Sequence, residues 1–158
     1  MTRPNDLLAM YQRFERLPLG KRLFAWMFSR KAPYFGSIRP QIESLQANRC
    51  VILLRKRRRV QNHIGTVHVI TICNALEMAM GAAAEAGIPP QLRWIPKGMQ
   101  VDYTARASSD IRAIAEIDPA AWQPGEVPVQ VRAERDDGTV VVQGQILLHV
   151  SEKPPRPS

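Results

Sequence analysis

One segment of this 158-residue chain restricts its fold more than any other. Residues 66–86 contain no proline and are rich in alanine, leucine and methionine, which are good helix formers. Gly87 marks the expected end of this helix, and Pro89 and Pro90 prevent its continuation. Because the helix has apolar side chains on nearly every face, we expect it to be buried within the protein.

Strand patterns precede and follow this helix. Two strands are expected before it, at residues 42–45 and 49–58, and alternating apolar residues predict four more after it, at 99–103, 110–117, 127–135 and 140–150. Asp137 and Gly138 are a typical hairpin turn between the last two. A single buried helix early in a run of antiparallel strands predicts an α+β fold in which the sheet curls around the helix.

The N-terminal part of the chain has helical periodicity. Apolar residues at helical spacing predict two helices within residues 5–31, separated at Pro18 and Gly20, and Pro33 and Pro40 bracket an expected loop. We therefore predict a helical extension (residues 1–36), one main domain (37–152) and a flexible tail (153–158). The second helix either packs on its own protein, which is the usual role of such a stripe, or lies on a membrane surface with its basic residues.

Positive charge dominates the sequence. The formal net charge is +8, and five consecutive positive charges come from Arg55, Lys56, Arg57, Arg58 and Arg59. Such an excess attracts polyanions. The run is either a solvated strand end or a site for coenzyme phosphates or an acidic carrier protein. A nucleic-acid partner is disfavoured, because the sequence has no helix-turn-helix, zinc-finger or aromatic-studded basic pattern.

Two cysteines, Cys50 and Cys73, have no CxxC or metal-binding spacing. They predict neither a disulfide scaffold nor a metal site, and they fit a reducing cytoplasm. The first residues lack the apolar stretch of a secretory signal, and no stretch approaches the roughly 18 uninterrupted apolar residues of a transmembrane helix. We therefore expect a cytoplasmic location.

Four residues stand at a recognisable spacing around the start of the central helix. Gly65 follows Asn62 by three residues, His68 follows Gly65 by three, and Glu77 lies nine residues further on. With this pattern the chain resembles the hotdog-fold thioesterases of the phenylacetate-pathway type, over about residues 37–150. Its N-terminal helices resemble an uncharacterised subgroup of that superfamily.

The resemblance implies an antiparallel sheet wrapped around one long central helix, and hydrolysis of acyl-CoA thioesters without a cofactor. It also implies a homodimer, or a tetramer built as a dimer of dimers. Carried over by position, the catalytic residues are Glu77, Asn62 and His68. The substrate-binding residues are expected to be Gly65, Thr66 and Val69, with Arg57, Arg58 and Arg59 near the nucleotide phosphates.

Glu77 is a candidate catalytic residue even without the resemblance, because it is an acid within an apolar stretch of helix. A buried carboxylate is costly unless it is paired. Burial also raises the pKa of a carboxylate toward the range that is useful for a general base. Glu77 is therefore either a group that activates water or attacks a thioester directly, or an acid that faces solvent or a partner side chain.

The spacing of His68 and Glu77 predicts a shared site. Nine residues along one helix correspond to about 13.5 Å of rise and about half a turn of rotation. Two such side chains cannot readily reach one substrate atom from the same helix. In a two-fold dimer with paired central helices, the glutamate of one subunit can approach the Asn–His loop of the other.

The sequence allows more than one role for most other residues of this loop. A neutral imidazole at His68 could donate to a substrate carbonyl, whereas His63 is expected to be structural. Asn62 orients water or substrate, or it caps the helix, and Thr66 is a second candidate cap. Gly65 suits a positive φ or a close approach of substrate.

One position departs from the family pattern. The glycine pair that usually follows the histidine is replaced by Val69 and Ile70, whose branched side chains would crowd an acyl group at the helix start. The departure favours an alternative, a hotdog protein that binds acyl-CoA or acyl chains without hydrolysing them. A hotdog dehydratase is disfavoured by the spacing of its histidine and acid, and a polyanion or membrane-surface binder using the basic run is the remaining alternative.

Overall fold

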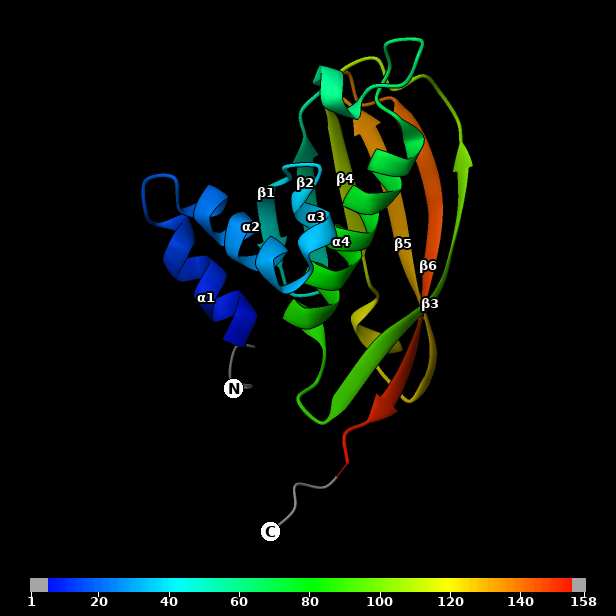
Figure 1. Ribbon diagram of the computed structural model, residues 1–158. Coiled ribbons are helices and arrows are strands. Elements are labelled where there is room, and N and C mark those ends of the chain that lie inside the picture. Colours follow the sequence, from blue (N-terminus) through cyan, green and yellow to red (C-terminus); the bar gives the residue numbers. More distant parts are fainter. Residues whose placement is uncertain (1–5, 155–158) are drawn as a thin grey trace.

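Helix α4, Val69–Gly87, lies within the curve of a six-stranded antiparallel sheet in the computed structural model, which describes residues 6–154 (Figure 1). The strands have the order β1-β2-β4-β5-β6-β3. Their bounds are β1 Gln41–Gln46, β2 Arg49–Leu54, β3 Leu92–Tyr103, β4 Ile111–Glu116, β5 Gly125–Arg135 and β6 Val140–Glu152. The predicted α+β architecture, with two strands before the central helix and four after it, is confirmed.

Alanine explains why α4 fits so closely against the sheet. Six alanines on the helix are at most 4% exposed: Ala75, Ala79, Ala82, Ala83, Ala84 and Ala86. Side chains this small let the helix backbone approach β2 and β4, against which α4 packs. The helix is long and apolar enough to cross a membrane by length and composition, but most of it is buried within the protein, and this composition is the one expected of a core helix.

Three predicted boundaries are wrong. Strand β3 begins at Leu92 instead of residue 99, because its pairing with β6 continues as far as Glu152. The central helix begins at Val69 with His68 as its N-cap, because Thr66 is engaged in the preceding loop. Strand β2 ends at Leu54 instead of residue 58, because Arg55 and Lys56 turn toward Asp110. The rest of the basic run enters a short 3-10 helix, η1, at Arg58–Val60.

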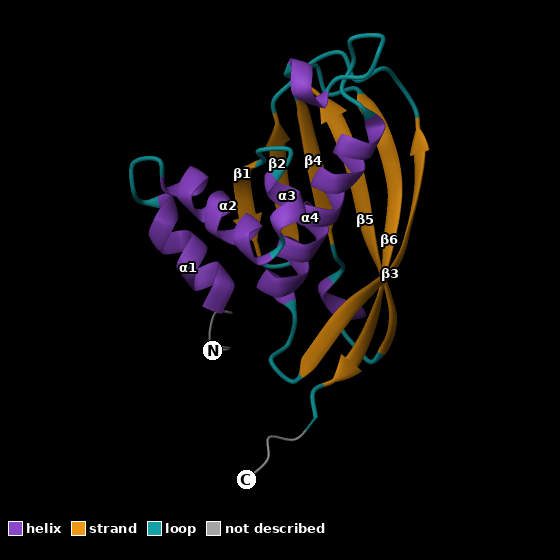
Figure 2. Ribbon diagram, in the orientation of Figure 1, coloured by secondary structure: helices purple, strands orange, loops and turns teal. Residues whose placement is uncertain are grey.

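Three helices form the N-terminal extension: α1 Asp6–Glu15, α2 Gly20–Lys31 and α3 Pro33–Gly36. The first two confirm the predicted pair, whereas the expected loop after Pro33 contains the short α3. Figure 2 shows the three helices grouped beside β1 and α4. The rings of Tyr11 and Phe24 meet edge to face at 5.2 Å, which ties α1 to α2. Gly20 is required at their junction, because a Cβ there would lie 1.6 Å from the carbonyl oxygen of Phe14.

The two edges of the sheet differ. Helix α2 packs against β1, whereas β3 pairs with β6 on one side and with no described strand on the other. Ile95 and Tyr103 on β3 are 60% and 64% exposed. A long, partly apolar edge strand of this kind is a template for pairing with another chain. Residues 155–158 of the predicted tail lie outside the described residues, so that prediction stands as made.

Candidate active site

The loop between η1 and α4 is organised by one side chain, Asn62. Its Nδ2 donates to Thr66 Oγ1 at 2.8 Å, and its Oδ1 accepts from the backbone N–H groups of Ile64 and Thr66 at 3.2 and 3.1 Å. Gly65 has φ of 76°, which confirms the positive φ expected at that position. The side chains of Asn62 and Thr66 therefore shape the loop that leads to the helix.

His68 follows this loop and caps α4. Its Nδ1 accepts a hydrogen bond from the N–H of Ile70 at 3.1 Å, while its backbone oxygen accepts from Thr71 and Ile72. An accepting Nδ1 requires the ring proton to be on Nε2. The exposed His68 side chain therefore presents Nε2–H as a donor beyond the helix terminus.

The helix start offers one backbone donor to a ligand. The N–H of Ile70 is occupied by His68, whereas the N–H of Val69 has no hydrogen-bond partner among the described residues. An unpaired N–H at a helix N-terminus is suited to a developing negative charge. The Val69 side chain is half-buried at this point, and Ile70 is 55% exposed.

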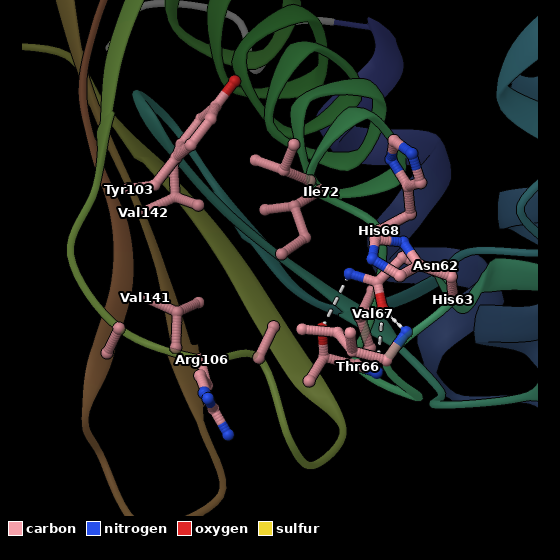
Figure 3. Close-up of a pocket in the computed structure, with 14 residues that line it drawn as sticks. Asn62, His63, Thr66, Val67, His68, Ile72, Tyr103, Arg106, Val141 and Val142 are labelled. Carbon is pink, nitrogen blue, oxygen red and sulfur yellow. Dashed lines mark hydrogen bonds between the residues drawn. The ribbon is translucent and has the colours of Figure 1, made fainter.

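A pocket of about 340 Å³ lies beside this loop. In Figure 3, Tyr103, Val141 and Val142 form one wall, and the loop with Ile72 forms the other. His63, His68 and Val69 also line the pocket, and Arg106 contributes a positive charge. No sequence pattern marks Tyr103 or Arg106 as site residues, because only the fold brings the end of β3 and the start of β6 beside the helix start.

Glu77 lies elsewhere. Its side chain is exposed on α4, so the prediction that its own chain buries it is wrong. It lines a second pocket of about 390 Å³, together with Phe28 and Phe35 of the N-terminal helices and Trp94 of β3. No described residue forms an ion pair or hydrogen bond with the Glu77 carboxylate. As the helical spacing predicts, His68 and Glu77 do not share a pocket within one chain.

The basic run divides into structural and exposed parts. Arg57 donates to the backbone oxygens of Ile38 and Arg39 at 2.9 and 3.4 Å, which ties η1 to the loop before β1. Arg55 pairs with Asp110 at 2.8 Å. Although burial acts to raise the pKa of Asp110, hydrogen bonds from the Lys56 N–H and from Arg55 lower that pKa below its usual value. The side chains of Arg58 and Arg59 are exposed and face outward from η1.

Neither thiol is suited to act as a nucleophile. Burial raises the pKa of Cys50 to about 12, and burial also raises the pKa of the half-buried Cys73. Within residues 6–154, no three His, Cys, Asp or Glu side chains gather as metal ligands. The groups available for chemistry are therefore an imidazole, a backbone N–H and a carboxylate.

A protein-family model matches most of the chain. The model described as "Domain of unknown function (DUF4442)" matches residues 20–150. The chain belongs to this family. The match includes α2 and α3 as well as the sheet and α4, so these N-terminal helices are part of the DUF4442 domain. No protein of curated function matches the sequence.

Solved structures confirm the fold of this DUF4442 protein. The genomics target APC5556 is 41% identical, with a TM-score of 0.80 over 93% of this chain and 99% of that one. The Pseudomonas aeruginosa protein PA5026, described as a probable thioesterase, is 18% identical, with a TM-score of 0.74 over 87% and 97%. The thioesterase HI1161 of Haemophilus influenzae is 10% identical, with a TM-score of 0.67 over 75% and 82%. These superpositions confirm the hotdog fold expected from the sequence.

Proposed function

We propose that this protein hydrolyses acyl-CoA thioesters at a site assembled from two subunits. The observation that carries the proposal is the separation of two complementary half-sites on one helix. The N-terminal end of α4 presents hydrogen-bond donors, namely His68 Nε2–H and Val69 N–H. The outward face of the same helix presents an unpaired carboxylate, Glu77, beside an apolar pocket.

The free edge of β3 supports the assembly of these halves. Trp94 and Pro96, in the first half of β3, line the Glu77 pocket, whereas Tyr103, at its last residue, lines the His68 pocket. In an antiparallel pairing of β3 with its copy, the first half of one strand runs beside the second half of the other. Such a dimer would bring the Glu77 pocket of each subunit beside the His68 pocket of its partner.

The chemistry follows from the groups that would meet. The Val69 N–H and His68 Nε2–H donate to the thioester carbonyl oxygen, which becomes negatively charged as the carbonyl carbon is attacked. Glu77 takes a proton from water, and the resulting hydroxide bonds to that carbon. The carbon–sulfur bond then breaks, and the departing thiolate receives the proton from Glu77. Direct attack by the carboxylate, followed by hydrolysis of the anhydride, is the alternative route to the same products.

The two ends of the substrate have matching surroundings. The apolar pocket beside Glu77 suits the acyl group, because Phe28, Phe35 and Met80 line it. The exposed guanidinium groups of Arg58 and Arg59 suit the nucleotide phosphates of coenzyme A. The half-buried Arg57 is better placed to hold η1 in position than to contact a phosphate. The thioesterases among the structural relatives add support through their shared fold.

The first test is hydrolysis of an acyl-CoA panel by the wild type and Glu77→Gln. We expect kcat to fall by about 10²–10⁴-fold in the variant, the usual contribution of a general base. Glu152→Gln is the matched control, because Glu152 is exposed at the end of β6, away from both pockets. Equal turnover by the wild type and Glu77→Gln would contradict the proposed role.

A second test asks whether the site is shared. Glu77→Gln and His68→Ala are each expected to be inactive alone. In a mixed dimer, one site receives both substitutions and the other receives neither, so coexpression should restore activity. If both residues served a site within one chain, every site in the mixture would carry one defect and the mixture would stay inactive.

A second candidate function is acyl-CoA binding without hydrolysis. It is favoured by Val69 and Ile70, because branched side chains stand at the helix start and the Ile70 N–H is already occupied. Saturable binding of acyl-CoA with no release of free thiol by the wild type would select this function.

A further inference from the structure

Helix α2 has an apolar stripe on the side that faces away from the protein. Leu19, Leu23 and Trp26 are 72%, 49% and 57% exposed, and their spacing places them on one face of the helix. The opposite face is the one that packs inward, through Phe24 and Ala25. The outward face therefore exposes large apolar side chains where a helix of this kind would ordinarily be polar.

The loop between α1 and α2 extends this apolar surface. Leu17, which lies in the loop, is 56% exposed. Leu19 has φ of 60° and ψ of 11°, a left-handed conformation that is unfavourable for leucine. The chain thus holds a strained leucine in contact with water. In Figure 1, this loop is the part of the molecule farthest from β3.

The segment that carries the stripe is rich in positive charge. Residues 6–36 contain only two acids, Asp6 and Glu15, and Glu15 is paired with Lys21 at 2.9 Å. The same segment carries six basic residues: Arg13, Arg16, Lys21, Arg22, Arg30 and Lys31. The Arg30 guanidinium lies 4.9 Å from the ring centroid of Trp26, so one cation lies directly beside the apolar stripe.

We propose that the docking surface formed by Leu17, Leu19, Leu23 and Trp26 binds the surface of an anionic lipid bilayer. Leucine and tryptophan side chains insert at the level of the headgroups, and flanking arginines attract anionic lipids. An anionic membrane is the occupant that matches both properties, because a neutral apolar partner would leave the arginines unmatched. The inference goes beyond the proposed hydrolysis and does not depend on it.

The position of α2 is compatible with a dimer paired through β3. Helix α2 packs on β1, which is the opposite edge of the sheet from β3. Pairing of β3 with its copy therefore leaves the docking surface of each subunit uncovered.

The test is co-sedimentation of the full chain with lipid vesicles. We expect binding to phosphatidylcholine vesicles that contain phosphatidylglycerol, little binding to phosphatidylcholine alone, and weaker binding as salt is raised. The double substitution Leu19→Ser and Trp26→Ser should weaken partitioning by about tenfold or more, through loss of inserted apolar surface. Arg22→Glu should weaken it at low salt and have less effect at high salt.

Tyr34→Ser is the matched control. Tyr34 is 70% exposed on α3 but does not belong to the docking surface, so its loss should leave vesicle binding unchanged. Circular dichroism and Tm verify that each variant is folded. The proposal is overturned by a wild type that does not bind anionic vesicles, or by a folded double variant that binds as well as the wild type. It is also overturned if the double substitution dissociates an oligomer without changing vesicle binding.

Discussion

The side chain of His68 caps helix α4, because its Nδ1 accepts a hydrogen bond from the Ile70 N–H at 3.1 Å. Val69, the first residue of the helix, lies between the two. One residue thus holds a structural bond through Nδ1 and is available for substrate through Nε2. The two functions can be separated by substitution, because asparagine is a good N-cap and alanine is not.

His68→Ala should lower stability by about 1 kcal/mol through loss of the cap, whereas His68→Asn should retain most of that stability. Both should lower kcat, because neither presents an imidazole N–H to the substrate. Thermal unfolding and acyl-CoA hydrolysis measure the two effects separately. Full activity in His68→Asn would restrict the residue to capping.

The branched side chain at the helix start should limit the acyl groups that are accepted. Val69→Gly removes this bulk beside the free N–H and is expected to raise kcat/KM for acyl groups branched next to the carbonyl. Glycine near a helix end should cost about 0.5–1 kcal/mol of stability. The measurement compares straight and branched acyl-CoA esters, with Ile70→Val as a control that leaves a branched side chain in place. An unchanged ratio between the two substrate classes would mean that Val69 does not crowd the acyl group.

The depth of the Glu77 pocket should set the length of the acyl chain. A Cβ at Gly81 would lie 3.6 Å from the Trp94 ring, which is ordinary contact, so Gly81→Ala should be tolerated. Gly81→Leu would fill the pocket, and we expect the preferred chain length to shorten while hydrolysis of short acyl groups continues. Rates across an acyl-CoA series give the answer. A preference that is the same in both variants would show that the acyl group lies elsewhere.

A charge on the free edge of β3 should prevent pairing of two copies. Ile95→Lys places an ammonium group on an edge position that is 60% exposed in the single chain, and we expect a monomer with little hydrolytic activity. Light scattering after size-exclusion chromatography measures the mass. Gln143→Lys is the control, because it adds the same charge on β6, a strand that is paired on both sides, with β5 and with β3. A dimer that survives Ile95→Lys with full activity would argue for a different interface.

Asp110 should make stability depend on acid pH. Its pKa is lowered below the ordinary 3.8 by hydrogen bonds from the Lys56 N–H and from Arg55, which outweigh the effect of burial. A carboxylate with a lowered pKa stabilises the folded state above its unfolded pKa, and this contribution is lost as pH falls through the folded pKa.

Asp110→Asn should therefore cost about 1 kcal/mol near pH 7, and the difference from wild type should shrink below about pH 4. Urea unfolding at several pH values measures this, with Asp102→Asn as a control at an exposed carboxylate that forms no ion pair in the described structure. If the difference in unfolding free energy between the variant and the wild type stayed constant as the pH fell below about 4, the effect would come from packing and not from the charge of Asp110.

Local sequence signals were sufficient for most of the secondary structure. Helix formers without proline located α4, and Pro18 with Gly20 located the junction of α1 and α2, because these effects act within a few residues. The end of β2 was predicted wrongly because a distant partner intervenes. Asp110 draws Arg55 and Lys56 out of the predicted strand, and no pattern near residue 55 announces that contact.

The candidate site divides in the same way. The sequence by itself determined the spacing of Asn62, Gly65, His68 and Glu77, and helix geometry alone separated the last two. Only the tertiary structure decided that Glu77 is exposed, that Phe28, Phe35 and Trp94 line its pocket, and that Tyr103 lines the pocket beside the histidine loop. The physical reason is that spacing along a helix is a local property, whereas burial and pocket walls depend on which distant strands and helices pack together.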